Sequence, residues 1–431
     1  MISVRARRSL ALALVVLLAV PLSAAGQNDY RYPITDRWLA TVVGTPNQIK
    51  AKLPTRDEIP LRKRRVDVFP DRKPPEALWY DDKMIYTVAL QKQDAAPVMF
   101  LIAGTGAAHN GSKNIMMARA FYQQGYHVVS LSSPTYGNFV GSASSTGVPG
   151  HVFRDAEDLY RAMEVAWNDA RGSRTATSYS LIGYSLGGLN AAFVAHLDNQ
   201  RKTFDFERVL LINPPVNLYN SISLLDRMVE NIPGGEDNFD LFFNRVLSTF
   251  SDVYKREQDD VGFNDDFLLK VFQAFQPKGE ELAALIGLAF RLSSGSMIFV
   301  TDLMTDYGFI KPKGYKINRY ESLTPYRQVA YRIGFTDFYH EFFYPFYADE
   351  YPDMSRDDFI ESMGLTSITD YLRSADNVFV IHNRDDIILA PGEINYFPAV
   401  FGDRAKIYPR GGHLGNMEYI ENVAHMVGVF K

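Results

Sequence analysis

Short runs of apolar residues recur along most of the chain, and segments with helical spacing separate them. Near-continuous apolar runs are typical of parallel strands that are covered on both faces. The pattern predicts strands at residues 66–69, 84–90, 98–103, 127–132, 179–183, 208–213, 378–381 and 405–408. The first two of these are expected to pair as a hairpin.

The segments between several of these strands have apolar side chains on one helical face. Residues 114–124 and 154–170 have this spacing, and in the second segment Leu159, Met163 and Ala166 share a face. Strands that alternate with helices indicate an α/β fold with a mainly parallel sheet flanked by helices.

One interval interrupts the alternation. Residues 216–375 separate the sixth predicted strand from the seventh, whereas a connection is usually about 2 to 6 residues long. Helical spacing recurs inside it, at residues 218–230, 240–255, 265–275, 280–291 and 322–334. We therefore expect a large, mostly helical cap between strands 6 and 7, over the C-terminal edge of the sheet, where α/β proteins bind ligands.

The cap contains an aromatic-rich segment from Phe335 to Tyr347. It is interpreted either as an apolar substrate pocket or lipid-facing surface, or as the core of the cap. The core interpretation is favoured, because bundles of helices bury large apolar side chains.

The sequence Gly183-Tyr184-Ser185-Leu186-Gly187 joins the strand at 179–183 to an apolar, helix-forming run. This context is typical of a nucleophile elbow, in which a serine occupies a sharp turn between strand and helix. Gly183 and Gly187 would remove the collisions that side chains cause in such a turn. A turn with an idle serine is the alternative, but the strand–turn–helix context favours Ser185 as a nucleophile.

A serine hydroxyl requires a histidine base and an acid that orients the histidine. His413 lies in the glycine-rich loop that follows the strand at 405–408, and Asp386 follows the strand at 378–381. Asp385 is the alternative acid. The chain order Ser185, Asp386, His413 is the order found in α/β-hydrolases.

In these motifs the chain resembles the α/β-hydrolase superfamily of serine esterases, lipases and peptidases. The resemblance implies an acid three residues after the glycine of a His-Gly-x-x-Asp pattern. His382 begins that pattern here and Asn383 replaces its glycine, so the match points to Asp386. The resemblance also implies that the cap covers the active site and shapes the substrate pocket.

Stabilisation of a tetrahedral oxyanion requires two backbone N–H groups that already point toward it. Leu186, directly after the nucleophile, is expected to supply one. The family often has His-Gly-x-Gly after the third strand, and residues 103–106 read Ala-Gly-Thr-Gly, which places Thr105 at the second donor position. Tyr184 and His109 are candidates for the pocket lining, although ordinary loop polarity is the favoured interpretation of His109.

The N-terminus has the organisation of a secretory signal peptide. Arg5, Arg7 and Arg8 precede an apolar stretch at 10–20, and small residues follow at 23–26. The stretch is shorter than the roughly 20 residues that span a bilayer, so no stable membrane span is expected after cleavage. The pair Arg7-Arg8 also permits twin-arginine export, and a periplasmic or secreted location is expected.

The expected organisation has five segments. They are a signal peptide at 1–26, an N-terminal arm at 27–62, the hydrolase core at 63–215 and 376–431, and the cap at 216–375. The 431 residues, 46% of them hydrophobic, suffice for one large domain with a cap.

Composition excludes several classes of function. The chain has no cysteine, so it has neither a thiol nucleophile nor a thiolate zinc site, which is compatible with export. A net charge of −5 with mixed signs gives no indication of a nucleic-acid partner. The basic run Lys63-Arg64-Arg65 is interpreted as a solvated strand edge. His340-Glu341 lacks the His-Glu-x-x-His spacing, so no metal and no other cofactor is expected.

The sequence thus predicts an exported serine hydrolase that forms an acyl-enzyme on Ser185. The expected substrate is a small ester of an apolar acid, because the cap is apolar and no charged specificity pocket is evident. A peptidase or amidase with the same triad is the alternative enzyme. A hydrolase-fold binding protein without catalysis is the alternative from another class.

Overall fold

The apolar runs form one eight-stranded sheet in the computed structural model, which describes residues 30–256, 272–277 and 279–431. The strand order is β1-β2-β4-β3-β5-β6-β7-β8. Strand β2 is antiparallel to both of its neighbours, and the other pairs are parallel. The strands are β1 (Leu61–Val66), β2 (Met84–Ala89), β3 (Ala95–Ile102), β4 (His127–Leu131), β5 (Thr175–Tyr184), β6 (Arg208–Ile212), β7 (Val378–Asn383) and β8 (Ala405–Tyr408).

The first strand lies earlier in the chain than the sequence predicts. It covers Leu61–Val66 rather than 66–69, so it begins inside the predicted N-terminal arm. The run Lys63-Arg64-Arg65 is part of this strand, at the edge of the sheet. The prediction was wrong because it looked for a continuous apolar run, whereas an edge strand needs only partial burial and often carries charge.

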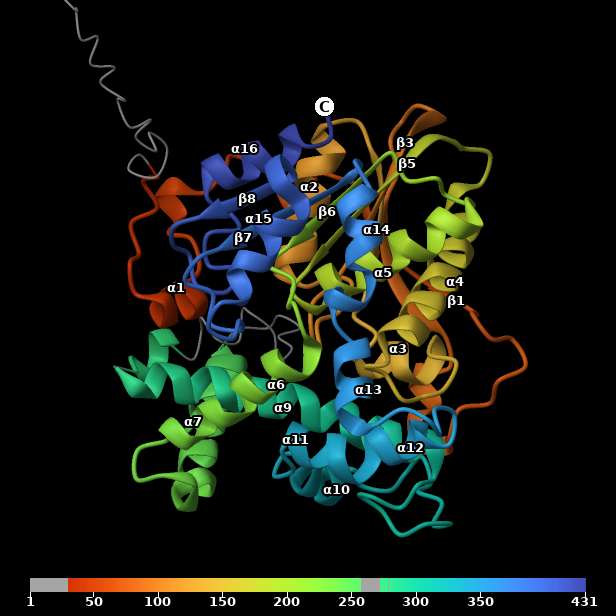
Figure 1. Cartoon of the computed structure of the whole chain (residues 1–431). Coiled ribbons are helices and arrows are strands. Elements are labelled where there is room, and N and C mark those ends of the chain that lie inside the picture. Colours follow the sequence, from red (N-terminus) through yellow and green to blue (C-terminus); the bar gives the residue numbers. More distant parts are fainter. Residues whose placement is uncertain (1–29, 257–271, 278) are drawn as a thin grey trace, which may run out of the picture. The chain divides into compact units, whose positions relative to one another are not determined.

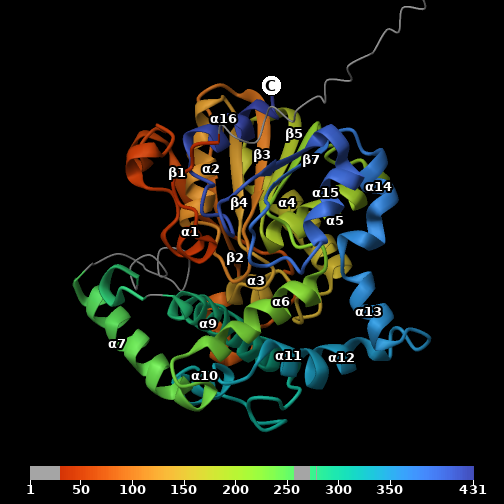
Figure 2. The ribbon, with the colours of Figure 1, turned by 60° about the vertical axis from the view of Figure 1, so that its left-hand side comes forward.

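Helices cover both faces of the sheet (Figures 1 and 2). Helices α2 and α16 lie against one face, and α4, α5, α14 and α15 lie against the other. Their amphipathic sequences explain this placement, since α4 buries Leu159, Met163 and Ala166 along one stripe. These helices are α2 (Ser112–Gln123), α4 (Val152–Arg171), α5 (Leu186–Arg201), α14 (Thr369–Ser374), α15 (Tyr396–Phe401) and α16 (Ile420–Gly428). A short further helix, α3 (Gly137–Ser142), lies between β4 and α4 in the chain.

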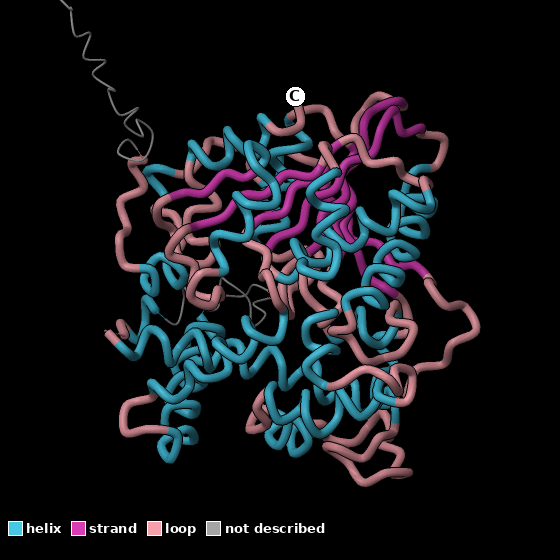
Figure 3. Tube along the Cα trace, viewed as in Figure 1, coloured by secondary structure: helices cyan, strands magenta, loops and turns pink. Residues whose placement is uncertain are grey.

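From α6 to α13 the described chain is largely helical, and it forms a layer below the sheet in the views of Figures 1 and 3. Helix α9 continues well beyond the predicted 280–291, and the predicted helix at 265–275 lies largely outside the described residues. The elements are α6 (Leu218–Arg227), η4 (Met228–Asn231), α7 (Phe239–Arg256), α9 (Glu280–Thr305), α10 (Thr324–Ala330), α11 (Phe335–Phe338), the π-helix η6 (Tyr339–Phe343), α12 (Tyr344–Ala348) and α13 (Arg356–Ser362).

The aromatic segment of the cap forms much of its core. Phe338, Phe342 and Tyr347 are fully buried, and Phe343 is almost so. The rings of Phe338 and Phe342 are stacked with centroids 5.0 Å apart. These side chains therefore pack inside the cap instead of forming an exposed surface.

Among the described residues, α9 is the one helix that is long and apolar enough to cross a membrane. However, 83% of its most apolar 18-residue stretch is buried inside the protein. A helix that is apolar on all sides is typical of the interior of a large protein as well as of a bilayer. Its contacts with α1 (Arg37–Val43) and α3 on one side and with α6, η4, α10 and α11 of the cap account for the burial.

The N-terminal arm packs beside the last strands of the sheet. It contains α1 (Arg37–Val43), which begins at the N-cap Asp36, whose side chain accepts a hydrogen bond from the Leu39 amide. Further along, Lys50 forms an isolated β-bridge with Tyr419. The predicted signal peptide at 1–26 lies outside the described residues.

Candidate active site

A sharp turn separates β5 from α5 and places Ser185 at its apex. Ser185 has φ 55° and ψ −128°, a conformation that costs free energy for a residue with a side chain. Its amide donates a 2.8 Å hydrogen bond to the Ile212 carbonyl at the end of β6. The strained conformation and its position are those of a nucleophile elbow.

The glycines on either side of the turn are required by close backbone contacts. A Cβ on Gly183 would lie 1.9 Å from the Gly187 carbonyl oxygen. A Cβ on Gly187 would lie 2.4 Å from the Ile102 carbonyl oxygen of β3. No other residue fits these two positions without displacing the strand or the helix.

The structure brings three of the predicted residues into one hydrogen-bonded row. His413 Nε2 lies 2.9 Å from Ser185 Oγ, and His413 Nδ1 lies 3.1 Å from both carboxylate oxygens of Asp386. If Nδ1–H donates to the carboxylate, Nε2 is left to accept the serine proton. This arrangement fits a base that is oriented by an acid.

The carboxylate of Asp386 is fully buried, and protein groups satisfy its oxygens. Asn213 Nδ2 donates a 2.6 Å hydrogen bond to Oδ2, and the Ile388 amide donates one of 3.1 Å to Oδ1. Burial alone would raise the pKa of Asp386, but the charge that His413 can carry and the hydrogen bonds from His413 and Asn213 outweigh it. The pKa therefore falls below its ordinary value, and the carboxylate stays charged.

Asn213 is a site residue that the sequence analysis did not identify. It follows β6 directly and has φ 47°, which aims its amide at the Asp386 carboxylate. A polar residue at the end of an apolar parallel strand, on the edge where ligands bind, was the available signal.

The structure places Asp385 against the histidine loop and Asp386 against the histidine ring. The two oxygens of Asp385 accept hydrogen bonds from the amides of Gly411 and Gly412, at 3.2 and 3.0 Å. Adjacent carboxylates therefore have separate tasks: one holds the loop backbone and the other contacts the imidazole.

Asn383, which replaces the glycine of the family pattern, also holds the histidine loop. Its Nδ2 donates to the Gly412 carbonyl at 2.8 Å and to Asn416 Oδ1 at 2.9 Å. In return, Asn416 Nδ2 donates to Asn383 Oδ1 at 2.6 Å. All of these groups are buried, so this departure from the family pattern adds hydrogen bonds that a glycine could not make.

The N-terminal arm contacts the same loop from the other side. Thr41 Oγ1 accepts a 2.9 Å hydrogen bond from the His413 amide and donates one of 2.7 Å to the Arg37 carbonyl. The hydroxyls of Tyr32 and Thr45 both donate to the Gly415 carbonyl, at 3.0 and 2.8 Å. Local sequence patterns do not reveal this role, because the contacts join segments about 370 residues apart.

The predicted oxyanion donors lie beside the serine. A Cβ on Gly104 would be only 3.0 Å from Ser185 Cβ, so the loop that carries Thr105 lies against Ser185. Leu186 is the first residue of α5, where amides have no partner within the helix. In the described part of the chain no hydrogen bond occupies the Thr105 amide, which leaves both N–H groups available to an oxyanion.

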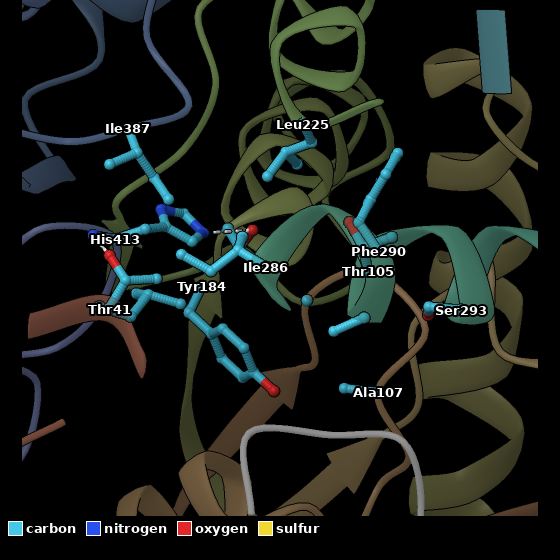
Figure 4. Close-up of a pocket in the computed structure, with 14 residues that line it drawn as sticks. Thr41, Thr105, Ala107, Tyr184, Leu225, Ile286, Phe290, Ser293, Ile387 and His413 are labelled. Atoms are coloured by element: carbon cyan, nitrogen blue, oxygen red, sulfur yellow. Dashed lines mark hydrogen bonds between the residues drawn. The ribbon is translucent and has the colours of Figure 1, made fainter. Parts of the chain in front are cut away.

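A cavity lies between Ser185 and the cap, with about 820 Å³ of empty space that includes its opening to solvent. Figure 4 shows the side chains that surround it. Thr41, Tyr184 and His413 contribute from the core, and apolar side chains of α6 and α9 contribute from the cap. The cap residues are Leu225, Ile286, Ala289 and Phe290.

His109 does not line this cavity, in contrast to Tyr184. Its ring is buried, with Nδ1 2.7 Å from Thr87 Oγ1 on β2, and its amide donates to Ser132 Oγ. Burial in these surroundings lowers the pKa of His109 to about 4. The candidate pocket role was wrong because the loop turns the imidazole toward the sheet.

No cluster of three or more histidine, aspartate or glutamate side chains within the described ranges has an arrangement that could hold a metal ion.

The strand order, the antiparallel β2, and an elbow between β5 and α5 together define the α/β-hydrolase fold. This chain therefore has the fold that its sequence motifs predict. The insertion between β6 and β7 supplies the cap, and the elbow lies beneath it.

No protein-family model matches the sequence, and no curated protein matches it. Solved structures with a similar fold include an esterase of Pyrococcus furiosus, which is 9% identical over 88% of this chain and 97% of that chain, with a TM-score of 0.40. A 2-hydroxy-6-oxo-6-phenylhexa-2,4-dienoate hydrolase from Rhodococcus is 14% identical over 86% and 99%, with a TM-score of 0.44. A thioesterase domain from the curacin biosynthetic pathway is 12% identical over 86% and 99%, with a TM-score of 0.39. The similarity concerns the general fold, so the chemical interpretation depends on the site.

Proposed function

We propose that this protein is a serine hydrolase that cleaves carboxylic esters through an acyl-enzyme on Ser185. One observation carries the proposal: Ser185 Oγ, the His413 ring and the Asp386 carboxylate form a continuous hydrogen-bonded row, with the serine at the floor of a cavity. A row of this kind gives a hydroxyl both a proton acceptor and access to a substrate.

In the first half-reaction Ser185 Oγ attacks the ester carbonyl carbon while His413 Nε2 takes the serine proton. The amides of Thr105 and Leu186 hold the negative oxygen of the tetrahedral intermediate. His413 then donates the proton to the leaving alcohol oxygen, and the carbon–oxygen bond of the ester breaks. Asp386 stays ionised and stabilises the imidazolium between these two steps.

In the second half-reaction water replaces the alcohol. His413 removes a proton from water, the resulting oxygen attacks the acyl carbon, and Ser185 leaves with the proton that His413 returns to it. The products are a carboxylic acid and the original enzyme. The chemistry needs no group beyond the residues of the site.

The lining of the cavity supports an ester of an apolar acid. Its walls are mainly aliphatic or aromatic, and within the described residues His413 is the only titratable side chain besides Tyr184. A peptide substrate has polar backbone N–H and C=O groups on both sides of the scissile bond. These would lack partners on such walls, which favours an ester over a peptide.

Labelling with a fluorophosphonate tests the catalytic proposal. The wild type should be labelled stoichiometrically, Ser185→Ala should not be labelled, and Ser374→Ala, on an exposed helix, should behave as the wild type. A folded wild type that remains unlabelled would refute the catalytic proposal and favour a binding protein without catalysis.

Comparison of p-nitrophenyl esters with aminoacyl nitroanilides separates an esterase from a peptidase, because only a peptidase should hydrolyse the anilides faster.

We further propose that the protein is exported. The proposal depends on the charged, apolar and small-residue sequence of positions 1–26. Expression of the full chain in a bacterium, followed by fractionation and N-terminal sequencing, tests it. Mature protein that begins near residue 27 outside the cytoplasm is expected, and an uncleaved cytoplasmic chain would refute it.

A further inference from the structure

Large apolar and aromatic side chains are exposed mainly in two short segments of the chain. Among the described residues nine such side chains are exposed, and six of them lie at positions 79–80 and 307–329. The six are Trp79, Tyr80, Tyr307, Tyr315, Tyr320 and Val329. Single exposed apolar side chains are normal on a protein surface, whereas a concentration of them marks a site of interaction.

The two segments lie against each other in the fold. Trp79 and Tyr80 belong to η3 (Glu76–Asp81), and their rings meet edge to face with centroids 5.8 Å apart. Burial raises the pKa of Tyr80, and the guanidinium of Arg327 on α10, beside the Tyr80 hydroxyl, opposes this rise. The loop between α9 and α10 forms the lowest part of the cap in the views of Figures 1 and 2. Together the two segments form one surface, the exposed aromatic surface.

The loop that carries Tyr307 and Tyr315 has its own internal support. The carboxylate of Asp302, buried at the end of α9, accepts hydrogen bonds from the four successive amides of residues 308–311, at 2.8 to 2.9 Å. The Lys311 side chain is buried beside them and pairs with a carboxylate of the same loop. A loop whose backbone groups are satisfied in this way has a defined conformation, so its tyrosines are held at the surface.

Basic residues accompany the aromatic ones. Residues 306–332 include six basic and two acidic residues, whereas the whole chain has a net charge of −5. Both acidic residues are engaged: Asp306 pairs with the buried lysine, and Glu321 accepts hydrogen bonds from two tyrosine hydroxyls at 3.1 and 2.9 Å. Beside the first segment, the Asp82 carboxylate pairs with Arg65 at 2.6 Å. The surface is therefore positive on a protein that is negative as a whole.

The other basic side chains of the surface are in contact with solvent. Lys313, Lys316, Arg319 and Arg327 are exposed, and in the part of the chain that the structure describes none of them forms an ion pair. The Arg319 guanidinium lies 5.0 Å from the centroid of the Tyr320 ring and donates a 2.9 Å hydrogen bond to its hydroxyl. Tyr320 is nevertheless 83% exposed. The aromatic rings and the cations are thus presented side by side.

A bilayer with anionic headgroups matches these features. Tyrosine and tryptophan have an apolar ring and a polar tip, so they are favoured at the level of the lipid headgroups. Lysine and arginine side chains next to them are attracted by anionic headgroups. A protein partner fits less well, because lysine is depleted at protein–protein interfaces. The combination of exposed rings and unpaired cations therefore favours lipid.

The exposed aromatic surface lies far from the cavity above Ser185. Ala289 lines that cavity, whereas the loop of the surface begins after Thr305, sixteen residues further along α9. At 1.5 Å per residue this separation is about 24 Å. Contact with a bilayer through this surface requires no change at Ser185, so the inference does not depend on the proposed esterase function.

We infer that the exposed aromatic surface binds anionic lipid bilayers, which makes this chain a peripheral membrane protein. Lys313, Lys316 and Arg319 bind the headgroups, and the rings of Trp79 and Tyr320 enter the headgroup layer. Because the cations are exposed to solvent, salt weakens the attraction.

Co-sedimentation with vesicles tests the inference. The protein is produced as the full chain, and wild type and variants are purified with the same N-terminus. The wild type should bind vesicles of phosphatidylcholine with one third phosphatidylglycerol about tenfold or more tightly than vesicles of phosphatidylcholine alone. Most of this binding should be lost between about 0.1 M and about 1 M salt. Equal binding to both kinds of vesicle, or binding to neither, would overturn the inference.

A variant without three of the charges locates the contact. Lys313→Gln/Lys316→Gln/Arg319→Gln should bind the anionic vesicles about a hundredfold more weakly, at about fivefold for each charge. The matched control removes three exposed lysines elsewhere in the chain and should keep most of the affinity. It is Lys52→Gln/Lys92→Gln/Lys406→Gln. An equal loss in both triple variants, with unchanged thermal unfolding, would show that net charge rather than this surface determines binding, and would refute the inference.

Trp79 reports the contact directly. It is 59% exposed and is one of the three tryptophans of the chain. Anionic vesicles should shift the fluorescence of the wild type to shorter wavelength, because the indole leaves water for the headgroup layer. Trp79→Phe should lose the shift and still sediment with the vesicles. A shift that persists in Trp79→Phe would place the contact elsewhere on the protein and contradict the inference.

A second copy of the chain is the alternative occupant of the surface. If the wild type does not sediment with anionic vesicles but is dimeric by light scattering, and the triple variant of the surface is monomeric, the surface is a protein interface and the lipid inference is refuted. Hydrolysis of p-nitrophenyl acetate in solution should be equal in the wild type and both triple variants, since none of the changed residues lies near Ser185.

Discussion

Two adjacent carboxylates, Asp385 and Asp386, bind different parts of the histidine loop. Asp386 contacts the His413 ring, and Asp385 accepts hydrogen bonds from the amides of Gly411 and Gly412. Only the first contact sets the tautomer and charge of the imidazole. The two residues should therefore differ sharply in their effect on catalysis.

Asp386→Asn should lower kcat by about three to four orders of magnitude, since an amide in this position stabilises the wrong tautomer and carries no charge. Asp385→Asn should lower kcat by less than about tenfold, because its amide oxygen still accepts one loop hydrogen bond. Steady-state kinetics on a p-nitrophenyl ester, normalised by active-site titration, measures both. A larger loss for Asp385→Asn would show that the acid is assigned to the wrong residue.

At the scale of elements, α1 supports the histidine loop although it lies far from that loop in sequence. Its Thr41 binds the His413 backbone and also lines the cavity. The loop is held on its other side by β7, through Asn383. The position of His413 thus depends on two elements that are remote from it in sequence.

Thr41→Val should lower kcat by about tenfold, because the valine leaves the His413 amide without an acceptor, at a cost of about 1 to 3 kcal/mol. Thr41→Ser should restore most of the activity, since it returns the hydroxyl. Steady-state kcat on a p-nitrophenyl ester is the measurement, alongside the melting temperature. Thr203→Val, at an exposed position, is the matched control, and an equal loss in both valine variants would contradict the role of α1.

At the scale of the whole molecule, buried histidines make stability depend on pH. Burial lowers the pKa of His109 to about 4, so the native protein keeps this ring neutral where the unfolded chain protonates it. As the pH falls below about 6.5, the unfolded state binds a proton that the native state does not, and stability decreases until about pH 4.

The loss attributable to His109 should reach about 3 kcal/mol by pH 4, because its pKa falls from 6.5 in the unfolded chain to about 4 in the native protein. His109→Asn places an amide group near the position of Nδ1, where it can still bond Thr87, and it cannot titrate. Urea unfolding of both proteins from pH 7 to pH 4 gives the difference. Parallel stability curves would show that His109 is protonated equally in both states.

Much of the sheet could be predicted from the sequence, because strands covered on both faces require continuous apolar runs. The runs at 98–103 and 208–213 correspond closely to β3 and β6. The failures occur where the pattern is missing or too short. Strand β1 is an edge strand without a continuous apolar run, and the helices α11 to α14 have too few turns to show a periodic pattern.

The sequence by itself determined the elbow around Ser185, since glycine spacing and the strand–turn–helix order are local properties of the chain. It also indicated the loops that carry Asp386 and His413. Only the tertiary structure decided which of two neighbouring carboxylates meets the imidazole, and that Asn213, Asn383 and Thr41 hold the parts in place. These choices depend on angstrom-scale distances between segments that are remote in sequence, and the cap helices that line the cavity are brought together only by packing.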